Sequence, residues 1–192
     1  MGLAELLLLS VGLAMDAFAV SICKGLASGK VAGKEYFLCG IWFGSFQAIM
    51  PLAGYLVGSN FEKYISMVAP WVAFTLLLLI GGNMIREAFG PKEETSPGFD
   101  VKTMFMMAVA TSIDALAVGI TFVAVPVEVF SAGHLLNVLF AVAVIGVITC
   151  FISMAGVKIG SIFGDRFKKW SEIMGGVILI IIGLKSLIEH LI

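Results

Sequence analysis

Charged residues are scarce in this sequence: 13% of its 192 residues are Asp, Glu, Lys or Arg, whereas 60% are hydrophobic. Soluble domains carry about 25% charged and about 45–50% apolar residues, so a soluble globular fold is excluded. The net charge of −1 comes without any basic block, which argues against a nucleic-acid partner. No G-x-x-x-x-G-K-[ST] motif is present, so ATP hydrolysis and a nucleotide partner are excluded as well.

Cysteine is also rare. Cys23, Cys39 and Cys150 lie in separate apolar stretches without C-x-x-C spacing, so neither a disulfide framework nor a thiolate zinc site is predicted. Packing is the expected role of these three side chains. The first residues include Glu5 but no basic segment, and the apolar run continues past the length of a signal peptide. This pattern predicts a retained first membrane span.

The apolar runs have the length of membrane spans. A helix needs about 20 apolar residues to cross the hydrocarbon core. Six segments meet this requirement, near 3–26, 36–57, 67–86, 103–125, 134–157 and 172–190. The sequence therefore predicts an all-α integral membrane protein with six transmembrane helices in the lipid bilayer.

Basic residues indicate the orientation of these spans. With the termini outside, the inner side holds Lys24, Lys30, Lys34, Arg86, Lys92, Lys102, Lys158, Arg166, Lys168 and Lys169. Only Lys63 and Lys185 remain for the outer side. Because inner loops are enriched in Lys and Arg, we expect both termini on the outer face.

Two parts of the sequence repeat each other. Residues 12–23 align without gaps on 110–121, which pairs Asp16 with Asp114. A shared glycine pattern aligns 44–61 on 146–163.

Three helices per half is an odd number, so the second half must enter the membrane from the opposite side. Such inverted repeats are typical of secondary transporters, whose site lies between the repeats near the bilayer centre. The expected organisation is a first three-helix repeat over 1–89, a cytoplasmic linker over 90–101 and a second, inverted three-helix repeat over 102–192.

Asp16 and Asp114 fall near the middle of their spans. An aspartate there costs roughly 2.5–3.5 kcal/mol on insertion scales, so each needs a partner or a wet cavity. No Lys or Arg lies at that depth, although Lys24 and Lys185 are near helix ends from which they can snorkel. We therefore expect a bound cation, and two carboxylates suit a hard divalent ion such as Mn²⁺, Mg²⁺ or Ca²⁺.

Further oxygen ligands are expected on the same helices. Thr111 and Thr121 share the face of Asp114, while Gln47 and its repeat equivalent Thr149 lie near mid-depth. For each of these four, hydrogen bonding between helices is an equally open interpretation. The candidate metal ligands are Asp16, Asp114, Thr111, Gln47, Thr121 and Thr149.

Two motifs carry a family resemblance. MDAFAVSICKG at 15–25 and SIDALAVGITF at 112–122 resemble the paired signatures of the bacterial MntP-type manganese efflux pumps, which are similar to the lysine-exporter superfamily. The resemblance covers nearly the whole chain and implies export of Mn²⁺, as substrate rather than cofactor, across the cell inner membrane. The family's acidic positions fall on Asp16 and Asp114, and its motif glycine falls on Gly25. Val123 stands opposite Gly25 in the second repeat, so this glycine's role is not symmetrical.

We expect a non-enzymatic, alternating-access transporter in which protons returning onto the same aspartates drive efflux. An exporter of another substrate, such as an amino acid or cadmium, remains an alternative, as does a passive divalent-cation channel. An intramembrane aspartyl protease is disfavoured because the accompanying G-x-G-D motif is absent.

Overall fold

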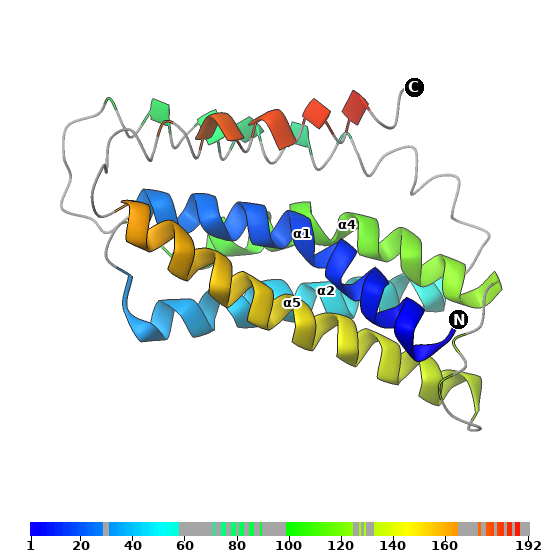
Figure 1. Ribbon diagram of the computed structural model, residues 1–192. Helices are drawn as coiled ribbons and strands as arrows, with labels where there is room; N and C mark the ends of the chain where they lie inside the picture. Colours follow the sequence, from blue (N-terminus) through cyan, green and yellow to red (C-terminus); the bar gives the residue numbers. More distant parts are fainter. Residues whose placement is uncertain are drawn as a thin grey trace.

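Four long helices dominate the computed structural model (Figure 1). They are α1 (Leu3–Ser28), α2 (Gly33–Val57), α4 (Val101–Ala124) and α5 (His134–Gly164). The structure describes residues 1–28, 31–57, 99–124 and 133–164 continuously, and single residues or short groups within 71–89, 127–129 and 173–188. No strand occurs in this described part of the chain.

All four helices are long and apolar enough to cross a membrane, which confirms four of the predicted spans and an all-helical membrane protein. The largest difference from the prediction is at the end of α5, which continues past 157 to Gly164. The side chain of Lys158 is exposed, and the helix continues past this residue. Ser161 Oγ donates to the Lys158 carbonyl at 2.9 Å in this extra turn.

The third and sixth predicted spans and the linker near 90–100 lie largely outside the described residues. Those residues that are described within 71–89 and 173–188 have helical backbone. The two segments approach each other closely at Gly81 and Gly176: a methyl group built on Gly176 would lie 2.5 Å from the Gly81 carbonyl oxygen. Ile178 and Ile182 pack against the buried core of the four long helices.

The helices pair across the two halves of the sequence. In Figure 1, α1 and α5 lie side by side and run in the same direction, as do α2 and α4. Helix α2 also packs against α5, whereas α1 makes few contacts with α2 and α4. Among the four described helices, the first helix of each half therefore packs mainly on the second helix of the other half.

The two ends of this bundle differ in charge. Helices α1 and α5 end, and α2 and α4 begin, at the end that we call the lysine end (Figure 1). It holds every lysine of the four helices, namely Lys24, Lys34, Lys102 and Lys158. The opposite, N-terminal end has the exposed Glu5 and a ring contact of 5.5 Å between Tyr55 and His134.

Glycines permit the closest approaches between helices. A methyl group on Gly44 of α2 would lie 2.6 Å from the Gly146 carbonyl of α5, and one on Gly146 would lie 2.8 Å from the Gly44 carbonyl. Gly54 of α2 meets the Leu116 carbonyl, and Gly156 of α5 meets the Phe18 carbonyl. The repeat alignment pairs Gly54 with Gly156 and Leu116 with Phe18, so matched residues make matched contacts.

We expect Gly44→Ala to lower the free energy of unfolding by about 1–3 kcal/mol, because the added methyl group forces α2 and α5 apart. Thermal unfolding in detergent micelles measures this change. Gly12→Ala is the matched control, since no atom lies within 4 Å of the added group. Equal stability of the two variants would show that α2 and α5 do not depend on close contact at Gly44.

Candidate polar site

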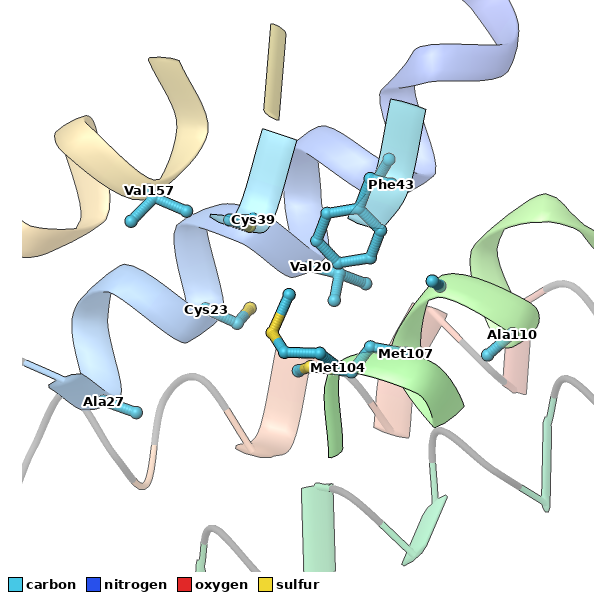
Figure 2. Close-up of a cluster of buried hydrophobic side chains, with 11 residues drawn as sticks. Val20, Cys23, Ala27, Cys39, Phe43, Met104, Met107, Ala110 and Val157 are labelled. Carbon is cyan, nitrogen blue, oxygen red and sulfur yellow. The ribbon is translucent and has the colours of Figure 1, made fainter. Parts of the chain in front are cut away.

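Two apolar clusters divide the bundle along its length. The lysine-end cluster consists of Ala17, Val20, Cys23, Ala27, Cys39, Phe43, Met104, Met107, Ala108, Ala110 and Val157. Figure 2 shows these side chains converging from all four helices. The N-terminal cluster consists of Leu6, Leu13, Ala115, Phe122, Val127, Val138, Ala141, Val142 and Ile145.

Polar residues of all four helices fall between the clusters. On α1 the interval between Leu13 and Ala17 contains Asp16, and on α4 the interval between Ala110 and Ala115 contains Asp114. On all four helices, we call the polar residues that lie between the two clusters the polar belt. They are Asp16, Gln47, Thr111, Ser112, Asp114, Thr149 and Ser153. Five of the six ligands predicted from the sequence thus lie at one level of the bundle.

Asp16 and Asp114 supply the only carboxylates of the polar belt. Asp16 is exposed and Asp114 is partly buried, and they are close enough that the charge of Asp16 acts on Asp114. Asp114 Oδ1 accepts the Ala115 N–H at 2.8 Å. Because α1 and α4 make few contacts, both carboxylates lie where two helices are weakly packed.

Three neutral oxygens of the belt are buried without a hydrogen-bond partner in the part of the chain that the structure describes. They are Gln47 Oε1, Thr149 Oγ1 and Ser153 Oγ, each on a side chain with 0% exposure. Gln47 Nε2 donates to the Leu13 carbonyl at 3.0 Å, which fixes this amide beside α1. Buried polar atoms are normally paired, so such oxygens are candidates for binding water or a cation.

The three remaining hydroxyls of interest are bonded within α4. Thr111 Oγ1 donates to the Met107 carbonyl at 3.0 Å, and Ser112 Oγ donates to the Ala108 carbonyl at 2.6 Å. Thr121 lies outside the polar belt; it is exposed and donates to the Val118 carbonyl at 2.7 Å. The structure therefore does not bring Thr121 together with the other predicted ligands.

Sequence reasoning missed Ser153. It lies one turn after Thr149, so the two hydroxyls share a face of α5. The repeat alignment pairs Ser153 with Pro51, which has no side-chain oxygen, and a search for matched polar residues therefore passes over it. Helical spacing from Thr149 was the available signal.

The polar residues named in the belt all offer oxygen atoms as ligands. Among the described residues, no group of three or more His, Cys, Asp and Glu side chains could hold a metal ion. Any cation here would be held by two carboxylates and neutral oxygens, a set that suits hard or borderline divalent ions.

The apolar helices define a multi-pass membrane protein, and the two carboxylates lie in a polar layer between its two apolar clusters. Its family is clear from comparison with known proteins. The chain belongs to the family described as "Putative manganese efflux pump", whose model matches residues 30–187. This membership and the helices together identify a multi-pass protein of the bacterial inner membrane.

Relatives with the name "Putative manganese efflux pump MntP" match along the full length. The protein of Desulfitobacterium hafniense is 50% identical over 100% of this chain and 97% of its own. The protein of Bifidobacterium adolescentis is 48% identical over 98% of this chain and 97% of its own. That of Methanosphaera stadtmanae is 43% identical over 96% and 98%. No solved structure matches the chain.

We expect Thr149→Val to raise the free energy of unfolding of the metal-free protein by about 1 kcal/mol, because it removes a buried hydroxyl without a partner and keeps the shape. Thr111→Val, which removes a bonded hydroxyl, should lower it by about 0.5–1 kcal/mol. Thermal unfolding in metal-free detergent measures both. A loss of stability in Thr149→Val would mean that this hydroxyl is paired.

Proposed function

We propose that this protein exports Mn²⁺ from the cytoplasm as a secondary transporter. One observation carries the proposal: aspartates on equivalent helices, α1 and α4, lie at one level in a polar belt between two apolar clusters. Charged residues at this depth mark ion pathways. The relatives' names supply the identity of the ion.

In the proposed site, Asp16 and Asp114 together provide the negative charge for the divalent ion. Gln47 Oε1 and Thr149 Oγ1 are available as neutral ligands because no described group binds them. Thr111 contributes through an oxygen lone pair while its proton stays on its own helix. We assign Thr121 to the route of the ion rather than to its coordination shell.

The proposed topology is six spans in two inverted halves, 1–89 and 102–192, joined by a cytoplasmic linker at 90–101. The matched contacts of Gly54 and Gly156 support a two-fold relation between the halves. The lysines gathered at one end support a cytoplasmic lysine end and outer termini, following the positive-inside rule.

Transport then follows by alternating access. In one state the side chains of the lysine-end cluster move apart, and Mn²⁺ reaches the carboxylates from the cytoplasm. In the other state the side chains of the N-terminal cluster move apart, and the ion leaves to the outside. Both clusters are apolar, so each excludes water and ions while it is closed. The halves rock against each other around the polar belt between these two states.

The central test replaces each aspartate by asparagine, which keeps the shape and removes the charge. In a bacterium without its own exporter, the unaltered protein should lower cell manganese and relieve manganese sensitivity. Asp16→Asn and Asp114→Asn should each abolish this effect at matched membrane abundance, since the one remaining carboxylate neutralises only half of the charge of the ion. Glu35→Gln is the control. The Glu35 carboxylate accepts the Ala32 N–H at the start of α2 and lies outside the belt.

If both asparagine variants still export manganese, the carboxylates are structural and the site is wrong. If the unaltered protein relieves cadmium or amino-acid stress but not manganese stress, the substrate is wrong while the site stands.

Protons returning to the carboxylates provide the driving force in this proposal. Export of a divalent ion against a negative-inside potential costs about 2.3 kcal/mol per charge per 100 mV. Competition between protons and Mn²⁺ for the same two carboxylates couples the two fluxes. Collapsing the pH gradient across membrane vesicles should therefore stop uphill Mn²⁺ transport. Manganese conductance that persists without proton movement would instead identify a passive channel.

A further inference from the structure

Lys24 of α1 is a buried cation outside the polar belt. It lies at the lysine end, yet only 5% of its surface is exposed. The sequence suggests a side chain that snorkels to the membrane surface, as lysines near helix ends commonly do. Its burial differs from the exposure of Lys34, Lys102 and Lys158 at the same end, and a buried ammonium must be compensated by specific partners.

Two of the groups near its charge belong to the start of α4. Lys24 Nζ lies 5.2 Å from the centre of the Phe99 ring, within the range of a cation–π interaction. Its charge also acts on Asp100, the next residue. Phe99 packs against the lysine-end cluster, and Asp100 Oδ2 accepts the Thr103 N–H at 2.9 Å, which caps α4. Lys24 thus joins α1 to the first turn of α4.

Asp100 carries the opposite charge at neutral pH. Partial burial raises the pKa of this carboxyl, but hydrogen bonds from Thr103 and the charge of Lys24 outweigh burial and hold the pKa below its usual value. The carboxylate is therefore ionised when Lys24 is protonated, and the two charges attract each other across the helix junction.

The junction lies between the cytoplasm and the polar belt. Lys24 is eight residues beyond Asp16, about 12 Å along α1. The side chains of the lysine-end cluster, including Val20, Cys23 and Met104, occupy this interval (Figure 2). Helices α1 and α4 make few contacts with each other, and the Lys24 junction adds to the packing of the lysine-end cluster that joins them at this end. An ammonium here also repels an approaching divalent cation.

We propose that Lys24 is a positioning residue that keeps the cytoplasmic entrance closed through its cation–π contact with Phe99 and its attraction to the charge of Asp100, and that its release admits Mn²⁺ to the carboxylates. This inference rests on the proposed function. It adds a residue that controls access to the site without touching the ion there.

Lys24→Met tests the proposal because it keeps the length and apolar bulk of the side chain and removes the charge. In inside-out vesicles, the KM for Mn²⁺ at the cytoplasmic face should fall about fivefold, since a larger share of the protein is open to that face. The kcat should not rise. A merely destabilised protein would lose activity without a lower KM. Lys102→Met, which removes an exposed charge at the same end, should leave KM and kcat unchanged.

A second variant and a second measurement do not depend on transport. Asp100→Asn removes the charge and keeps a good helix cap. In purified metal-free protein, amide hydrogen exchange over 99–104 should increase in Lys24→Met and in Asp100→Asn but not in Lys102→Met. If Lys24→Met fails to insert into the membrane, Asp100→Asn decides by the same two measurements.

The outcomes separate the two proposals. If the unaltered protein transports Mn²⁺ but neither variant changes KM or exchange, the role of Lys24 is overturned and the proposed function stands. If amide exchange increases in the two variants but the unaltered protein transports no Mn²⁺, the proposed function fails, and the entrance role of Lys24 fails with it. The faster exchange would then show only that Lys24 and Asp100 stabilise the start of α4. A lower KM together with faster exchange supports the proposal.

Discussion

The close approach of helix backbones at glycines is the interaction on which the rest of this structure depends. Inside a bilayer, lipid tails are as apolar as leucine, so helices associate through packing rather than through the hydrophobic effect. Gly44 and Gly146 bring α2 against α5, while Gly54 and Gly156 bring α2 against α4 and α5 against α1. Without these contacts the polar residues of four helices could not share one level, and each aspartate would have to be accommodated separately.

The function proposed for the polar belt depends on the apolar clusters on either side of it. A carboxylate pair in lipid is costly, but in the proposed mechanism the same pair, between two apolar clusters that open in turn, binds the transported ion. The buried oxygens of Gln47, Thr149 and Ser153 add groups that have no described partner in the present state. Buried groups left unsatisfied cost stability, and such a cost is tolerated where another state or a ligand satisfies them.

The level of a side chain along the bundle could be predicted from the sequence, whereas its burial against a neighbouring helix could not. Counting residues from the ends of apolar runs was enough to predict that Asp16 and Asp114 share a level, because helical rise is constant. Whether Gln47 is buried and Thr121 exposed depends on which helices lie beside α2 and α4, and no local pattern carries that information. Lys24 illustrates the same limit: its place near a helix end suggested solvent, but the side chain is buried and its ammonium lies over the ring of Phe99, which is distant in sequence.

The exchange of partners between the halves also has a consequence for biogenesis. Among the four described helices, α1 packs mainly on α5, and α2 on α4 and α5, so these two helices gain most of their described neighbours only after the second half has been synthesised. They must remain apart in the lipid, or beside the insertion machinery, while the chain is completed. In the proposed inverted topology, a protein made of one such half could reach the same packing only by pairing with a copy inserted in the opposite orientation. Fusing both halves into one chain removes the need for two orientations of a single sequence.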